Sequence, residues 1–166
     1  MLKTNGLILS FDKLNIMTRT LDKTENLLLL SNNYIGSLGY ISQNRPYVLP
    51  ITYFYNAEEK NIICYSAIGH KINAMRKNHS VSLCITDIDS VNEWKSVLVH
   101  GTYEERSGSN AKALLHQFSL GVKELIIRKE LRDLNFLSEF TSKQNDEIPI
   151  IFTLSVDEIT GRIRKF

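Results

Sequence analysis

Successive strand patterns joined by tight turns constrain this chain more than any other feature of its sequence. Apolar and β-branched residues alternate with polar ones over short stretches, most regularly in residues 80–86 and 94–104. The predicted strands cover residues 34–42, 47–56, 62–66, 80–86, 94–104, 150–156 and 162–166. Because short turns join most of these strands, the sheet is expected to be antiparallel, and a closed barrel is its simplest arrangement.

Helical patterns are fewer and shorter than the strands. Residues 20–25 look like a helix start, with Asp22 or Thr20 as the N-cap and Glu25 three residues after Asp22. Further helices are expected over residues 70–77, 110–118 and 122–134, a polar loop over 87–93, a polar linker over 143–147 and a turn over 157–161. The fold class is therefore mainly β with short helices (α+β). We expect residues 1–20 to form a tail and residues 21–166 a single domain.

Composition excludes several classes of function. The 166 residues are 43% hydrophobic and 23% charged, which is ordinary for a globular protein, and the net charge of +2 gives no reason to expect nucleic acid or an anionic membrane as a partner. No apolar run approaches the ~20 residues that span a bilayer, so a cytoplasmic protein is expected. The cysteines Cys64 and Cys84 are expected to be reduced core thiols. The four histidines show no metal-ligand spacing, so we expect no metal site.

The segment 64–71 joins a strand to a helix and carries the chemistry of an anion site. The apolar strand ends at Ser66, Gly69 follows, and the next helix begins with His70 and Lys71. A helix N-terminus offers unpaired N–H groups, the Ser hydroxyl can donate, and the Lys ammonium adds a full charge. A phosphate monoester is the natural ligand for such a joint. The alternative is a plain connector between strand and helix, with His70 as a cap or facing water.

Several motifs in order make the chain resemble the flavin-binding split-barrel superfamily, which includes pyridoxamine-phosphate oxidase and the nitroimidazole-resistance-like flavoproteins. The matching segments span residues 22–166: Arg45-Pro46-Tyr47-Val48-Leu49-Pro50-Ile51-Thr52-Tyr53, then Cys64-Tyr65-Ser66-Ala67 with Gly69-His70-Lys71, Met75-Arg76-Lys77-Asn78, Trp94-Lys95-Ser96-Val97 with Gly101, and Ile159-Thr160-Gly161-Arg162. The resemblance implies a six-stranded antiparallel split barrel that forms a homodimer, with flavin mononucleotide (FMN) bound between the subunits.

The resemblance also implies roles for particular residues. Leu49, Pro50, Ile51 and Thr52 would supply backbone contacts to the isoalloxazine edge of the flavin. Tyr65 and Ser66 would lie along the ribityl-phosphate tail, and His70 with Lys71 would hold the phosphate. Ser96 matches a position at which oxidase relatives place a longer amide side chain toward the flavin.

Three departures separate the chain from pyridoxamine-phosphate oxidases and nitroimidazole-type relatives. Tyr65 stands where many nitroimidazole-type members have His, so a reductase role of that His does not carry over. Leu49 stands where the oxidases have a phosphate-binding cation, and their C-terminal substrate-holding Arg and Trp have no clear counterpart. We therefore expect a flavin binder and not an enzyme that makes pyridoxal phosphate.

Three functions follow from this comparison. The first is an FMN-dependent oxidoreductase that takes hydride from a reduced nicotinamide, NADH or NADPH, and passes electrons to a small acceptor such as a nitroaromatic or quinone, with no single catalytic residue assigned. The second is a flavin- or haem-binding protein without a reaction of its own, with His70, His79 or His100 as candidate axial ligands. The third is a structural dimer whose ligand site has decayed.

Overall fold

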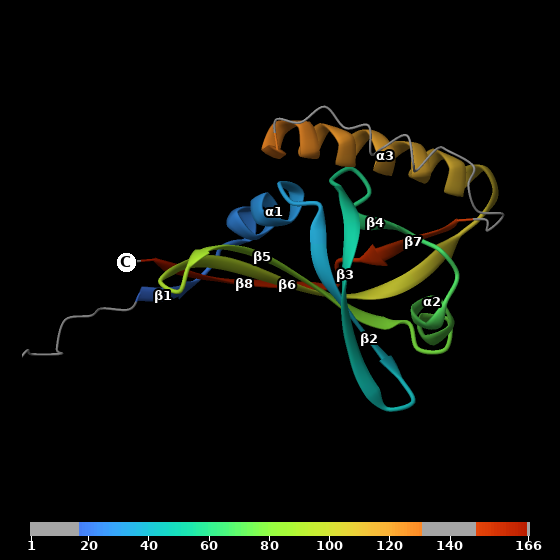
Figure 1. Ribbon diagram of the computed structural model, residues 1–166, viewed down its shortest axis with the longest axis horizontal. Helices are drawn as coiled ribbons and strands as arrows, with labels where there is room; N and C mark the ends of the chain where they lie inside the picture. The colour runs from blue at the N-terminus through green and yellow to red at the C-terminus, as the bar shows by residue number, and fades with distance from the viewer. Residues whose placement is uncertain (1–16, 131–148, 166) are drawn as a thin grey trace, which may run out of the picture.

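A computed structural model describes residues 17–130 and 149–165 of the chain, which form one antiparallel sheet and the helices that cover it (Figure 1). The elements are β1 (Met17–Thr20), α1 (Lys23–Ser31), β2 (Ile35–Ser42), β3 (Arg45–Asn56), β4 (Asn61–Ser66), α2 (His70–Met75), β5 (Ser80–Ser90), β6 (Glu93–Arg106), α3 (Gly108–Glu130), β7 (Ile150–Ser155) and β8 (Glu158–Lys165).

The sheet closes on itself because β6 is long enough to pair with two different strands along one edge. Its first half, Trp94 to His100, pairs with β8, and its second half, Tyr103 to Arg106, pairs with β7. The ring therefore runs β6-β5-β2-β3-β4-β7 and returns to β6, while β8 and β1 extend the sheet from the first half of β6. The predicted six-stranded antiparallel split barrel is confirmed.

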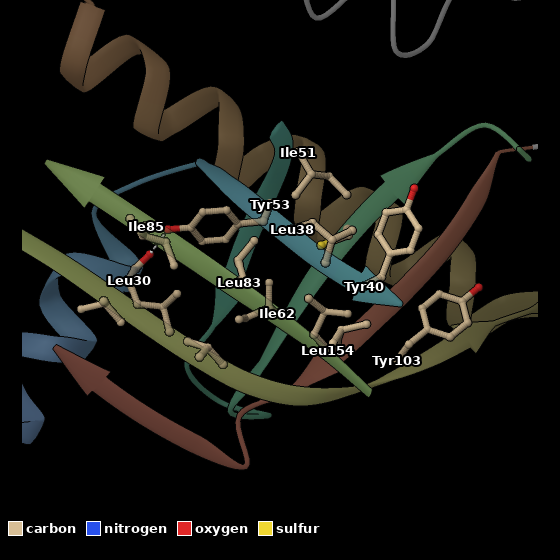
Figure 2. Packing of buried hydrophobic residues seen from close by; sticks show 14 of the residues in the cluster. Leu30, Leu38, Tyr40, Ile51, Tyr53, Ile62, Leu83, Ile85, Tyr103 and Leu154 are labelled. Atoms are coloured by element: carbon tan, nitrogen blue, oxygen red, sulfur yellow. Dashed lines mark hydrogen bonds between the residues drawn. The ribbon is translucent and has the colours of Figure 1, made fainter. Parts of the chain in front are cut away.

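Alternating residues of the ring strands fill the barrel with apolar side chains (Figure 2). Leu38 of β2, Tyr53 of β3 and Leu83 of β5 are all fully buried. Tyr53 brings a polar group into this core, and its hydroxyl donates a hydrogen bond of 2.7 Å to the backbone carbonyl of Leu30. Burial raises the pKa of the Tyr53 phenol, which therefore stays protonated as a donor. Figure 2 shows this bond linking β3 to the last turn of α1.

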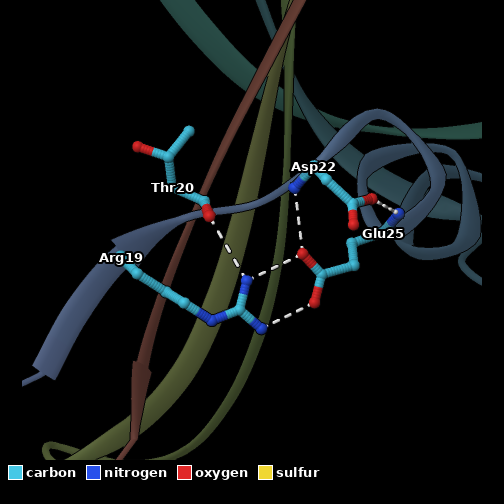
Figure 3. A network of polar contacts seen from close by, with 4 residues as sticks. All are labelled: Arg19, Thr20, Asp22 and Glu25. Atoms are coloured by element: carbon cyan, nitrogen blue, oxygen red, sulfur yellow. Dashed lines mark hydrogen bonds and ion pairs between the residues drawn. The ribbon is translucent and has the colours of Figure 1, made fainter.

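Helix α1 begins with a complete capping box, as its sequence predicts (Figure 3). The Asp22 carboxylate accepts from the Glu25 N–H at 2.9 Å, and the Glu25 carboxylate accepts from the Asp22 N–H at 2.9 Å. Arg19 of β1 adds two hydrogen bonds to Glu25, at 2.6 and 2.8 Å. These contacts lower the pKa of Glu25 to about 2, with the Arg19 hydrogen bonds as the largest cause.

Helix α3 lies across the outer faces of β3, β4 and β7, where it buries a second apolar cluster (Figure 1). Two separate helices were expected here, with a break near Gly121, but α3 is continuous. Gly121 marks a close contact instead of a break, because a Cβ at this position would lie 2.1 Å from the Phe54 ring. None of the helices in the described residues, α3 included, is long and apolar enough to cross a membrane.

Several other boundaries differ from the sequence prediction. The expected loop 87–93 is mostly strand, since β5 runs to Ser90 and β6 starts at Glu93. The expected turn 157–161 is the first half of β8, and Met17–Thr20 of the expected tail forms β1. The turn between β2 and β3 lies at Gln43 and Asn44, whose φ angles are positive, and β3 begins at Arg45, two residues before the predicted strand. The expected linker 143–147 lies outside the described residues.

Candidate functional site

The joint between β4 and α2 leaves a helix N-terminus without an internal cap. Ser66 is buried at the end of β4, and its hydroxyl donates to the Ala67 carbonyl at 2.9 Å. The N-cap residue Gly69 has an extended backbone (φ 174°) and makes no side-chain cap hydrogen bond. The first helical bond runs from the Asn73 N–H to the Gly69 carbonyl, so the N–H groups at the start of α2 have no partner within the helix.

Lys71 places a cation in the first turn of this uncapped helix. Its residue is half-buried, and no ion pair links it to any residue in the ranges 17–130 and 149–165. Burial raises the pKa of the Cys64 thiol, and the Lys71 charge opposes that rise. A half-buried cation at the positive end of a helix dipole is unfavourable unless an anion accompanies it.

Strand β3 has an open edge beside this joint. β3 pairs with β2 from Arg45 to Thr52, but it pairs with β4 only from Tyr53 to Asn56. On the side away from β2, no strand among the described residues pairs with the stretch 45–52. The backbone groups that point to this side are therefore available to a ligand.

The register of β3 decides which of the four predicted residues offers a donor at the open edge. The Tyr53 N–H donates to the Tyr34 carbonyl, so the backbone N–H and C=O groups of Tyr53 point toward β2. Counting back along the strand, the backbone groups of every second residue also point toward β2, and those of the residues between them point toward the open edge. Leu49 and Ile51 thus direct their N–H groups toward β2. Pro50 has no N–H, and Thr52 offers the remaining backbone donor of the four.

His70 is held by aromatic neighbours from the adjacent hairpin. The Tyr40 hydroxyl lies 3.0 Å from His70 Nδ1 and forms a hydrogen bond with it, and burial raises the pKa of the Tyr40 phenol. The Tyr47 ring stacks on Tyr40 at 5.4 Å and lies 4.8 Å from the imidazole. Sequence reasoning missed Tyr40 because it lies 30 positions before His70.

The basic residues near the end of α2 separate into two kinds. Arg76 forms two hydrogen bonds of 2.8 Å with Glu105, which also accepts from the Tyr103 hydroxyl. These contacts lower the pKa of Glu105, with the Arg76 hydrogen bonds as the largest cause. Arg76 is thereby neutralised within the chain, whereas Lys77, like Lys71, has no ion pair with a described residue.

Two of the predicted flavin contacts, Tyr65 and Ser96, are placed differently from Ser66, His70 and Lys71. Tyr65 faces outward from β4 toward α3, where its ring centroid is 6.3 Å from that of Phe118, while Ser66 faces the barrel interior. Ser96 lies on β6, opposite Thr86 in β5 and Arg162 in β8. The strand order places β5 and β2 between Ser96 and β3. Within one copy, Ser66, His70 and Lys71 thus lie on the β4–α2 joint and Thr52 on the adjacent strand β3, whereas Ser96 lies on another part of the ring.

The histidines offered as haem ligands do not gather around an apolar cavity. His70 bonds Tyr40, and His79 packs edge-on against Tyr103. A pocket of 650 Å³ beside α1 is lined by apolar residues such as Leu27 together with charged ones such as Lys60 and Asp157, and no histidine of the described chain lines it. Among the described residues, no group of His, Cys, Asp and Glu side chains is placed to hold a metal ion.

The six-stranded ring is that of an antiparallel split barrel, and helix α2 with its uncapped N-terminus lies beside the open edge of β3. Comparison with known proteins identifies the family. The family model described as pyridoxamine 5'-phosphate oxidase matches residues 22–163. The chain belongs to this family.

Individual relatives agree with this assignment. An uncharacterized protein of Rhizobium meliloti (strain 1021) is 28% identical over 151 residues, which cover 89% of this chain and 95% of that protein. The crystal structure of a FAD-binding protein from Mesorhizobium loti matches with a TM-score of 0.70 and 25% identity, over 91% of this chain and 99% of that one. A FAD and haem binding protein from Mycobacterium smegmatis matches with a TM-score of 0.65 over 89% of this chain and 74% of that one, and at 14% identity it supports the fold alone.

Proposed function

We propose that this protein is a flavoprotein that holds the phosphate of FMN at the β4–α2 joint and the flavin ring along the open edge of β3. Lys71 is the observation that carries the proposal, because a half-buried cation at an uncapped helix start has no ion pair in the described chain. A phosphate would accept from the free N–H groups and from Lys71 at once. The Mesorhizobium loti relative, which is a FAD-binding protein, supports a flavin as the ligand.

The open edge of β3 suits the planar, polar rim of a flavin ring. Thr52 provides a backbone N–H, and Pro50 provides a carbonyl without a competing N–H. Leu49 and Ile51 anchor this stretch by packing against the barrel core. The strand can therefore orient a ring through its backbone with little movement of its own.

We further propose an oxidoreductase function. A bound flavin supplies hydride and electron transfer, here from NADH or NADPH to a small oxidised acceptor such as a nitroaromatic or a quinone. The chain contributes binding, orientation and hydrogen bonds to the ring, and these tasks require no acid–base side chain. The backbone donors at β3 fit this division of labour.

We also propose that the site is completed by a second copy of the chain. Ser96 lies on β6, which β5 and β2 separate from β3 in one copy, so we expect its predicted contact with the flavin to come from another subunit. The outer sheet face carries exposed apolar side chains at Ile35 of β2, which is 56% exposed, and Val48 of β3, which is 72% exposed. An isologous dimer would cover such a face.

The first experiment is a visible absorption spectrum of the purified full chain, followed by mass analysis of any released cofactor. We expect flavin bands, release of a flavin nucleotide and bleaching when reduced nicotinamide is added without oxygen. A flavin spectrum that does not bleach would leave a flavin carrier. A Soret band, or a colourless protein that takes up neither FMN nor FAD, would contradict the proposal.

A further inference from the structure

Helix α1 is apolar on two sides, although the barrel covers only one of them. Residues 27–30 are four successive leucines, of which Leu29 and Leu30 are buried in the barrel core. Leu28 is 54% exposed, and Leu27 is half-buried. Because a surface helix with one buried face normally carries polar residues on the opposite face, the second apolar face of α1 indicates a binding surface.

This second face of α1 forms one wall of the pocket of 650 Å³ described above. Residues 23, 24, 27, 28 and 31 of the helix line it, and their spacing is that of one helix face. Tyr55 of β3, Val156 and Ile159 of β8 line it from the sheet, and all three pack against the barrel core. The volume lies within the ~300–1,000 Å³ that is typical of a site for a small molecule.

The turn between β3 and β4, which contributes Ala57 and Lys60 to the lining, is held in place by the chain itself. The Asn56 side-chain oxygen accepts from the N–H groups of Glu58 and Glu59 at 3.1 and 3.3 Å. Lys60 ends the turn with a positive φ of 53°. A turn fixed in this way presents Lys60 to the pocket with little further ordering of the backbone when a ligand binds.

The polar groups of the pocket favour one negative charge. Neither Lys23 nor Lys60 forms an ion pair within residues 17–130 and 149–165. The acidic residue of the lining, Asp157, already accepts from the Thr102 hydroxyl at 3.1 Å. Burial raises the pKa of Tyr55, so its phenol stays protonated, and it makes no hydrogen bond to the described part of the chain. Two ammonium groups and one phenol are therefore free to donate to a ligand.

We propose that this pocket binds a small carboxylate with an apolar body. The apolar body lies between the leucines of α1 and the floor of Val156 and Ile159, and the carboxylate accepts from Lys23, Lys60 and the Tyr55 hydroxyl. The pocket shares no residue with the β4–α2 joint or with the open edge of β3 at residues 45–52. The inference therefore goes beyond the proposed flavin function and does not depend on it.

The test is isothermal titration of the full chain with decanoate and with decan-1-ol, which has the same chain length but no charge. Decanoate is expected to bind with a Kd below about 0.1 mM. Lys23→Gln and Lys60→Gln should each weaken decanoate binding by about three- to tenfold, the size expected for one partly screened charge-assisted hydrogen bond, and change decanol binding by less than about twofold. Ala57→Trp, which adds an indole at an exposed turn residue of the lining, should weaken both ligands by about tenfold or more.

Lys123→Gln, at an exposed lysine of α3, is the matched control and should bind both ligands as the wild type does. No decanoate binding at about 1 mM, or binding that none of the three pocket variants changes, would overturn the proposal. Equal losses of decanoate and decanol in the lysine variants would show that the lysines do not hold a carboxylate and would overturn it as well. Sedimentation of the same proteins tests a different occupant, because a dimer that dissociates in Ala57→Trp would assign the pocket to a contact between two copies of the chain.

Discussion

Helices α1 and α2 both begin directly after a strand, but they treat their N-terminal N–H groups in opposite ways. α1 carries Asp22 and Glu25, whose carboxylates accept from each other's backbone, and Arg19 neutralises Glu25 (Figure 3). α2 begins at Gly69 without a side-chain cap, and its first turn contains Lys71 and no acidic residue.

The difference distinguishes a helix start that the chain caps itself from one that has no side-chain cap. At α1 the chain supplies its own anion, so the start of the helix is satisfied before any ligand arrives. At α2 the dipole, the free N–H groups and Lys71 all favour a negative charge that the described residues do not provide. This contrast within one molecule supports α2 as the place where a phosphate binds.

The largest change in FMN affinity is expected when α2 receives a carboxylate N-cap like that of α1. Gly69→Asp should lower FMN affinity by about a hundredfold or more, because an internal carboxylate would take the N–H groups and repel the phosphate. The backbone is extended at φ 174° and a Cβ would meet nothing within 4 Å, so the substitution fits without strain. The free energy of unfolding without ligand should rise by a few tenths of a kcal/mol.

Isothermal titration with FMN measures the loss, and thermal unfolding without ligand measures the gain. Gly69→Asn is the matched control, since it has nearly the same shape as aspartate but no charge, and it should lose less affinity than Gly69→Asp. FMN binding by Gly69→Asp that equals the wild type would show that the phosphate does not lie at this helix start.

A smaller effect is expected when the cap of α1 is removed. Asp22→Ala should lower the free energy of unfolding by about 1 kcal/mol, the usual cost of losing an N-cap side chain, and should change flavin affinity by less than about twofold. Denaturant unfolding and FMN titration of the same preparation check both parts. A large loss of flavin affinity would show that the two helix starts are coupled.

The pH dependence of the unfolding free energy tests the other carboxylate at the start of α1, Glu25. Because Glu25 has its pKa lowered from 4.5 to about 2 in the fold, its stabilising contribution is complete above pH 4.5 and is lost as the pH falls toward 2. The difference in unfolding free energy between the wild type and Glu25→Gln should follow this course. A difference that stays constant from pH 6 to pH 2 would contradict the ion pair with Arg19.

Local patterns predicted much of the fold because they depend on neighbours in sequence. The capping box of α1 needs only Asp22 and Glu25, and the strands of the ring alternate because one of their faces is buried. The outer part of the β5–β6 hairpin was read as a loop because its residues, such as Asp87 and Asp89, are exposed and lack an apolar face. β1 was missed because a short edge strand depends on its partner β8 and carries little pattern of its own.

The candidate site was predictable only in its contiguous part. Ser66, His70 and Lys71 are close in sequence and lie at the joint as expected, although their roles in binding remain predictions. The bond from Tyr40 to His70 and the open edge of β3 depend on the closure of the barrel, which no local pattern encodes. The strand order, which puts β5 and β2 between Ser96 on β6 and the open edge of β3, likewise could not be predicted from the sequence.

The most direct test of the central claim compares FMN with riboflavin, which lacks the phosphate, in the wild type and in Lys71→Ala. If Lys71 and the start of α2 hold the phosphate, FMN affinity falls by about tenfold or more in the variant while riboflavin affinity changes by less than about twofold. Lys123→Ala serves as the control and should bind both ligands as the wild type does. Equal losses for FMN and riboflavin, or no loss for either, would contradict the claim that this helix start binds a flavin phosphate.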